Sequence, residues 1–142
     1  MQIQNILVVC VGNICRSPMA QYLLRQQYPH LNIDSAGVAG LVGQTADPKA
    51  QFCLKKLNLD LSQHVAKKLD SHMLKNADLI LVMSQGQQHY LEKNWPFAKG
   101  KTFRLGHWQS CDIADPYHLD QSTFDQTCQL IQHCIQDWKS YI

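Results

Sequence analysis

The chain lacks any long uninterrupted hydrophobic run, because none of its apolar segments approaches the roughly 20 residues that a membrane-spanning helix requires. It also lacks a strong excess of one charge: charged residues make up 17% of its 142 residues, and the formal net charge is +2. Proteins that bind nucleic acid or membrane surfaces through charge carry a larger basic excess. The opening MQIQNILVVC has no basic segment before its apolar part, which argues against a signal peptide. We therefore expect a cytoplasmic protein that neither binds nucleic acid nor inserts into a membrane.

No internal repeat, low-complexity tract or linker-like stretch divides the chain, so we predict a single domain spanning residues 1–142. Six cysteines could form three disulfides, but a chain of this length buries enough core to be stable without them. We therefore expect reduced thiols. The cysteines and histidines show no convincing zinc spacing, so we expect neither a metal nor another cofactor. The cysteines are Cys10, Cys15, Cys53, Cys111, Cys128 and Cys134.

Short apolar segments alternate with amphipathic helical segments along the chain. The pattern predicts strands over 6–11, 31–37, 78–83 and 101–105. It predicts helices over 19–28, from 48 to about 57, over 85–95, and from a capping-box-like start at Ser122 to Trp138. Residues 106–121 are predicted to be loop. Alternating strands and helices predict an α/β fold: a Rossmann-like three-layer sandwich with a parallel sheet of about four strands, which binds ligands at the carboxyl ends of the strands.

The stretch CVGNICRSP, residues 10–18, follows the first predicted strand and leads into a helix. Backbone N–H groups of a tight loop at a helix N-terminus form an anion site, and a guanidinium such as that of Arg16 suits two oxygens of a phosphate. The same positive field favours the thiolate of Cys10, and Ser17 can donate its hydroxyl to it. The stretch therefore predicts a nucleophile and a phosphate cradle in one loop.

An acid is also needed, because the phenolate of a tyrosine leaves poorly unless it is protonated during departure. Asp115 in DIADPYH is the best candidate, since it lies in the longest loop after the last predicted strand. Tyr117 beside it can line a slot for an aromatic ring. An Asp-Pro pair also commonly begins a turn, and the residues alone leave both interpretations of Asp115 open.

With these motifs, the chain resembles the low-molecular-weight protein tyrosine phosphatases over essentially its whole length. The resemblance rests on CVGNICRSP and DPY, and on SAG at 35–37, ADP at 46–48 and HVAKKL at 64–69 in the same order. The SAGVAGLVG loop and DPYH are more similar to the bacterial branch, associated with exopolysaccharide and capsule. The expected partner is a phosphotyrosine protein, namely a tyrosine autokinase that controls surface polysaccharide export. We expect a monomer.

The resemblance implies a role for each matching residue. Cys10 is the nucleophile of a phosphocysteine mechanism, Arg16 stabilises the transition state, and Asp115 is first the general acid and then the general base. Asn13 holds the loop in a left-handed turn, Ser17 supports the thiolate, and His64 contacts Asn13 and Ser17. The walls of the substrate cleft are Leu41 and Tyr117, and the phosphate-binding loop comprises Val11, Gly12, Asn13, Ile14, Cys15 and Arg16.

Some points stay open. Lys67 stands where many members have arginine, which puts one supporting contact of the loop in doubt. Cys15 either packs beneath the loop or traps an oxidised Cys10 as a disulfide. A thiol-dependent arsenate reductase shares the loop, but no cysteine lies between Cys53 and Cys111, where its resolving cysteines are expected. A catalytically dead phosphotyrosine-binding module is the non-enzyme alternative.

Overall fold

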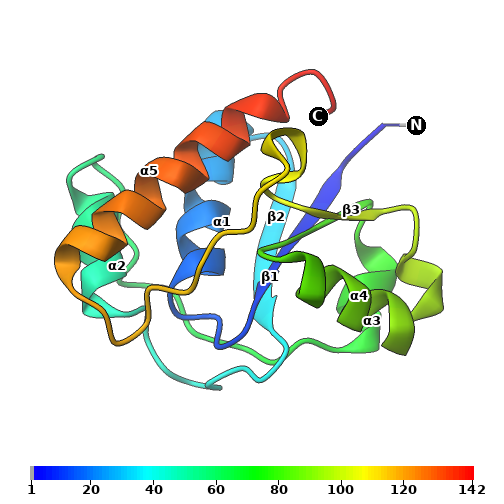
Figure 1. Ribbon diagram of the computed structural model, residues 1–142, viewed down its shortest axis with the longest axis horizontal. Coiled ribbons are helices and arrows are strands. Elements are labelled where there is room, and N and C mark those ends of the chain that lie inside the picture. The colour runs from blue at the N-terminus through cyan, green and yellow to red at the C-terminus, as the bar shows by residue number, and fades with distance from the viewer. Residues whose placement is uncertain (1) are drawn as a thin grey trace.

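A computed structural model describes residues 2–142, and its centre is a parallel four-stranded sheet (Figure 1). The strands are β1 (Asn5–Cys10), β2 (Asn32–Gly37), β3 (Leu79–Val82) and β4 (Thr102–Arg104), in the order β2-β1-β3-β4. All three pairings are parallel. The predicted α/β fold with a small parallel sheet is therefore confirmed, and its four strands lie within the predicted segments to within one residue.

Helices cover both faces of the sheet (Figure 1). One face packs against α1 (Arg16–Gln27) and α5 (Gln121–Asp137), and α2 (Pro48–Lys55) packs against these two helices. The other carries α3 (Ser71–Asn76) and α4 (Gln85–Asn94), and short 3₁₀ helices, η1 (Pro96–Ala98) and η2 (His107–Gln109), flank β4. None of the helices in the described part of the chain has the length and apolar character needed to span a bilayer.

The alternation of side chains along β1 separates two hydrophobic cores. Ile6 and Val8 face the α1 and α5 layer, whereas Leu7 and Val9 face the α3 and α4 layer, and all four are buried. A central parallel strand buried on both faces requires such a continuous apolar run. The run ends at Cys10, so the chain leaves the sheet at the carboxyl end of a rigid central strand.

Two helix starts test the capping predictions. The expected N-cap at Asp47 is confirmed, because its side chain accepts a hydrogen bond from the Lys49 N–H and α2 begins at the following proline. The predicted capping-box start of the last helix at Ser122 is wrong. Asp120 is the N-cap instead, since its carboxylate accepts from the Thr123 N–H at 2.9 Å, and the helix begins at residue 121. Helix α3 was not predicted at all.

Candidate active site

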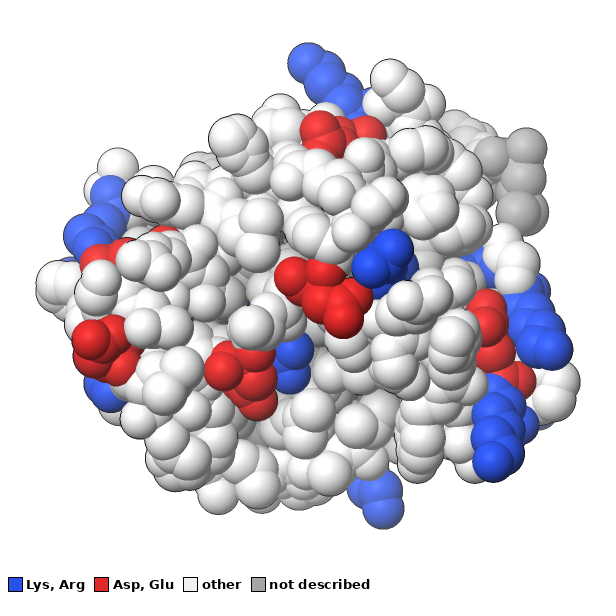
Figure 2. Space-filling view, in the orientation of Figure 1, with Lys and Arg blue, Asp and Glu red and all other residues white. Residues whose placement is uncertain are grey.

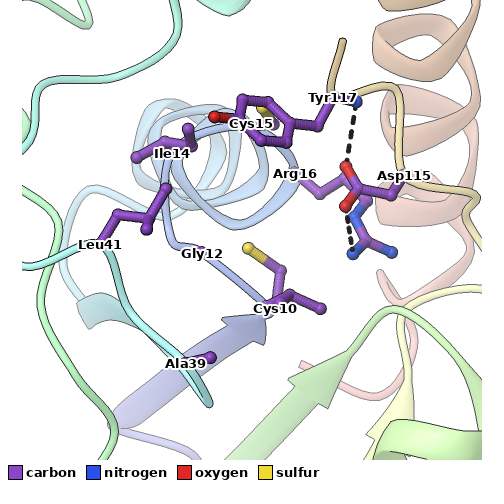
Figure 3. Close-up of a pocket in the computed structure, with 10 residues that line it drawn as sticks. Cys10, Gly12, Ile14, Cys15, Arg16, Ala39, Leu41, Asp115 and Tyr117 are labelled. Carbon is purple, nitrogen blue, oxygen red and sulfur yellow. Dashed lines mark hydrogen bonds and ion pairs between the residues drawn. The ribbon is translucent and has the colours of Figure 1, made fainter. Parts of the chain in front are cut away.

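A cavity of about 280 Å³ opens at the carboxyl end of β1, between the loop that follows this strand and the loop after η2 (Figure 3). It lies where a parallel sheet is expected to bind its ligand. Residues far apart in the sequence form its walls and floor. They are Cys10, Val11, Gly12, Ile14, Cys15, Arg16, Ala39, Leu41, Asp115 and Tyr117. All but Ala39 are among the predicted site residues; Asn13, Ser17 and His64 lie behind the loop.

The Cys10 thiol lies at the base of the cavity, where the residue is only 2% exposed. Its Sγ is 2.9 Å from Ser17 Oγ. Asn13 Nδ2 donates to the same Ser17 oxygen at 2.8 Å. Because that bond occupies the oxygen as an acceptor, the Ser17 hydroxyl hydrogen is free to point at the sulfur. The arrangement stabilises negative charge on Cys10.

Asn13 shapes the loop from behind. Its φ of 61° is in the left-handed region, which asparagine tolerates better than most residues. Its Oδ1 accepts the Lys67 backbone N–H at 3.0 Å, and His64 Nε2 lies 2.8 Å from its carbonyl oxygen. The expected link from His64 to Ser17 thus runs through Asn13. Since the contact at Lys67 is made by the backbone, it does not require the arginine found in many family members.

His64 is buried, and this sets its protonation. Desolvation lowers the pKa of its imidazole and outweighs the opposing effect of the hydrogen bond to Asn13. A neutral imidazole that donates from Nε2 to the Asn13 carbonyl is the form that fits this position. His64 therefore supports the loop as a hydrogen-bond donor without adding charge.

Two further members of this polar network, Ser35 and Gln21, were not predicted from the sequence. Asn13 Nδ2 also donates to Ser35 Oγ at 2.9 Å, and the Ser35 hydroxyl donates to Gln21 Oε1. Gln21, Asn13 and Ser35 are at most 3% exposed. A buried chain of satisfied hydrogen bonds holds its members in one arrangement. The SAG motif at 35–37 was the available signal: its serine belongs to this chain, and its glycine lies against the loop.

Arg16 is the main cation of the cavity and is only 4% exposed. Its Nη1 donates to the Ile113 carbonyl at 2.8 Å, which fixes the guanidinium plane. Its buried Nε has no hydrogen-bond partner among the residues that the structure describes. An unpaired buried donor costs free energy unless a ligand satisfies it. The guanidinium therefore has an open edge suited to an oxyanion.

Asp115 faces this arginine across the mouth of the cavity (Figure 3). Its Oδ2 lies 3.5 Å from Arg16 Nη2, and its side chain is 44% exposed. Its Oδ1 accepts the Tyr117 backbone N–H at 3.1 Å, which forms an Asx turn. The Asp-Pro pair thus begins a turn, as one interpretation predicted, and the second carboxylate oxygen remains directed at Arg16, which leaves the predicted acid role sterically open.

Apolar side chains form the upper walls. Leu41 lies on one side and the Tyr117 ring extends across from the other, over the loop (Figure 3). Ala39, which the sequence analysis missed, follows β2 and adds to the lining. These groups offer no charge, so they suit a flat apolar ring attached to the group bound below.

All six cysteines are free thiols, and Cys10 and Cys15 line the cavity. Burial, followed by the nearby carboxylates of Asp47 and Asp115, raises the pKa of the Cys15 thiol. Cys15 is therefore a protonated thiol at neutral pH. Among residues 2–142, no group of three or more His, Cys, Asp or Glu side chains is arranged to hold a metal ion.

Known proteins are similar to this chain in sequence and in fold. The chain is 62% identical to the low molecular weight protein-tyrosine-phosphatase Ptp of Acinetobacter johnsonii, over 100% of both chains. The structure of Vibrio vulnificus Wzb in complex with benzylphosphonate is 37% identical, with a TM-score of 0.95 over 99% of this chain and 100% of that one. The YwlE arginine phosphatase of Geobacillus stearothermophilus is 32% identical, with a TM-score of 0.88 over 94% and 88%.

The family model described as low molecular weight phosphotyrosine protein phosphatase matches residues 5–142, which include the cavity and all the residues that line it. The chain belongs to this family, and it is a protein tyrosine phosphatase of the bacterial branch.

Proposed function

We propose that the protein hydrolyses phosphotyrosine in two steps through a phosphocysteine at Cys10. The carrying observation is that the buried Cys10 thiol, the open edge of Arg16 and the carboxylate of Asp115 converge on one cavity. These three groups supply the nucleophile, the oxyanion ligand and the proton donor that phosphoryl transfer to a thiolate requires.

In the first step, the Cys10 thiolate attacks phosphorus in line and the P–O bond to the tyrosine breaks. The carboxyl group of Asp115 gives its proton to the departing phenolate. Arg16 donates hydrogen bonds to the equatorial oxygens of the phosphoryl group, together with backbone N–H groups at the start of α1. The products are a neutral tyrosine and an S-phosphorylated enzyme.

In the second step, water attacks the phosphocysteine. The Asp115 carboxylate, now deprotonated, accepts a proton from this water as it forms its bond to phosphorus. The S–P bond breaks, inorganic phosphate leaves, and the Cys10 thiolate is restored beside the Ser17 hydroxyl. The same carboxyl group thus acts as acid and then as base.

The cavity walls support a preference for phosphotyrosine over smaller phosphoesters. Cys10 is 2% exposed at the base of a cavity whose walls include Leu41 and the Tyr117 ring. Apolar walls favour an aryl group in this cavity. Benzylphosphonate, bound in the Vibrio vulnificus relative, joins an aromatic ring to a tetrahedral phosphonate in the same way.

Rapid-quench mass spectrometry tests this mechanism. During turnover of a phosphotyrosine peptide we expect one phosphoryl group on the peptide that contains Cys10, and Cys10→Ser should lose both this adduct and turnover. Peptides with phosphoserine or phosphoarginine at the same position serve as controls and should react at least tenfold more slowly. Full turnover by Cys10→Ser would overturn the proposal, and faster reaction of phosphoarginine would reassign the substrate.

As its physiological role, we propose that the protein acts as a monomer in the cytoplasm on a tyrosine autokinase of surface polysaccharide export. Its similarity to Wzb and its six free thiols, which suit a reducing compartment, support this role. The charges on the face shown in Figure 2 are small clusters of mixed sign, unlike the broad basic patch of a nucleic-acid-binding protein. Cys10→Ser protein should retain the phosphorylated autokinase and release it with inorganic phosphate. Retention of the unphosphorylated kinase to the same extent would argue against recognition through this site.

A further inference from the structure

Tyr117 and His118 form an aromatic pair in the loop that carries Asp115. Their ring centroids are 3.8 Å apart, with the planes tilted by 36°. Neighbouring side chains in an extended chain point in opposite directions, so consecutive rings do not normally meet. Here they meet because the backbone of His118 has a φ of 69°, in the left-handed region. The chain thus holds an unfavourable backbone conformation that places the second ring against the first.

Hydrogen bonds on both sides of this pair hold the backbone of the turn. The Tyr117 N–H donates to the Asp115 carboxylate, and the Leu119 N–H donates to the Pro116 carbonyl at 2.9 Å. The ammonium group of Lys49, at the start of α2, donates to the Leu119 carbonyl. The backbone that carries the His118 ring is therefore held by bonds within the protein and does not depend on a ligand.

Tyr117 needs such support because it is 38% exposed at the mouth of the cavity. An exposed side chain samples several staggered rotamers, and fixing one of them on ligand binding costs entropy. A second ring packed against it restricts this motion before the ligand arrives. A wall that is already in place binds an aryl group more tightly without altering the chemistry below it.

We infer that His118 is a positioning residue, which holds the Tyr117 ring as the aromatic wall of the cleft and thereby sets the preference for aryl phosphates. This inference rests on the proposed function, since it concerns the same substrate. His118 acts through the Tyr117 ring, whereas the support of the phosphate loop comes from Asn13 and His64, which are not part of this turn.

The test compares a substitution that removes the ring with one that keeps an aromatic ring. His118→Asn removes the ring but keeps a residue that adopts the left-handed conformation readily. His118→Phe restores an aromatic ring. With p-nitrophenyl phosphate and a phosphotyrosine peptide, we expect His118→Asn to raise KM about three- to tenfold while kcat stays within about twofold. Inhibition by inorganic phosphate, which occupies the loop alone, should not change. His118→Phe should recover most of the parental KM.

A double-mutant cycle separates positioning from a general structural effect. If His118 acts through Tyr117, then His118→Asn should have no further effect on KM in a Tyr117→Ala background. His118→Gly, which is also free to adopt a positive φ, replaces His118→Asn if the latter fails to fold. An unchanged KM in His118→Asn overturns the inference. It is also overturned if inhibition by inorganic phosphate weakens as much as KM rises, or if the KM of His118→Phe is as high as that of His118→Asn.

The two proposals fail in different ways. The phosphocysteine mechanism fails if Cys10→Ser remains active, whatever the His118 variants do. The inference about His118 fails if Cys10→Ser is inactive and the KM for aryl phosphates is nevertheless insensitive to the ring at position 118.

Discussion

Asp115 Oδ2 lies 3.5 Å from Arg16 Nη2 across the mouth of the cavity, so a carboxylate and the main cation of the cavity form an ion pair. In the proposed mechanism, a bound phosphate takes over this guanidinium and frees the carboxyl group to act on the leaving oxygen. The ion pair would then hold Asp115 at the mouth of the cavity before substrate binds. Because the carboxyl group is 44% exposed, we attribute little folding free energy to the pair.

We expect Asp115→Asn to lower kcat for a phosphotyrosine peptide by about 10²- to 10³-fold, because the amide cannot protonate the leaving phenolate. The amide oxygen can still accept the Tyr117 N–H, so the turn should persist. The kcat for a substrate whose leaving group is already stable as an anion, such as 2,4-dinitrophenyl phosphate, should fall much less. Steady-state kinetics with both substrates checks this, and equal losses for the two would contradict the role of Asp115 as an acid.

Gly37, at the end of β2, lets the phosphate loop lie close to the sheet. A Cβ added here would approach the Val11 carbonyl oxygen to 2.4 Å and the Asn13 nitrogen to 3.0 Å. We expect Gly37→Ala to lower kcat/KM by at least about tenfold, because a small displacement of catalytic groups is costly. It should also lower the free energy of unfolding by about 1 to 3 kcal/mol.

Gly86 provides the matched control for this substitution. It lies in α4, and the nearest atom to an added Cβ is Ser84 Oγ at 3.8 Å. Gly86→Ala should leave kinetics unchanged and raise the free energy of unfolding by about 0.5 to 1 kcal/mol. Denaturant titration and phosphatase assays of both variants check these expectations. An unchanged kcat/KM in Gly37→Ala would mean that the phosphate loop tolerates displacement.

Lys67 should tolerate substitution although it contacts the phosphate loop. Its backbone N–H makes the bond to Asn13, while its side chain pairs with Asp34, and the two side chains are 41% and 48% exposed. An exposed pair of this kind is worth at most about 1 kcal/mol. We expect Lys67→Arg and Lys67→Ala to change kcat/KM by less than about twofold. A large loss in Lys67→Ala would show that the ammonium group itself supports the site.

His64 should make stability depend on pH. Because its pKa is lowered in the folded protein, the unfolded chain binds the proton more strongly between that lowered pKa and the ordinary value of 6.5. The stabilisation from His64 is therefore fully present above about pH 6.5 and is lost as the pH falls through this window.

Urea unfolding of the parent and of His64→Gln checks this expectation. The glutamine amide can donate to the Asn13 carbonyl but does not titrate. At pH 8, the difference in free energy between the two proteins reports hydrogen bonding and packing alone. This difference should shrink toward pH 5, and a gap that stays constant or widens would show that His64 is not kept neutral by the fold.

Local patterns in the sequence were sufficient to predict much of this molecule. The buried strand before Cys10 and the loop around Gly12 and Arg16 are contiguous, and their chemistry follows from neighbouring residues. The helix start at Asp47 and Pro48 was predicted for the same reason. The N-cap of the last helix was misplaced by two residues, since both Asp120 and Ser122 are good N-caps and only the hydrogen bond to the Thr123 N–H distinguishes them.

The tertiary structure decided what depends on distant residues. Ser35 and Gln21 join the loop because β2 and α1 pack beside β1; the SAG motif marks Ser35, but nothing in the sequence around Gln21 marks that residue. The approach of Asp115 to Arg16 spans 99 positions of sequence, and only folding brings the two within 3.5 Å. The pairing of Tyr117 with His118 is local in sequence but depends on a left-handed backbone angle that residue type alone does not dictate. By itself the sequence determined the kind of chemistry, because a nucleophile and its anion cradle share one short segment; packing decided which side chains hold them in place.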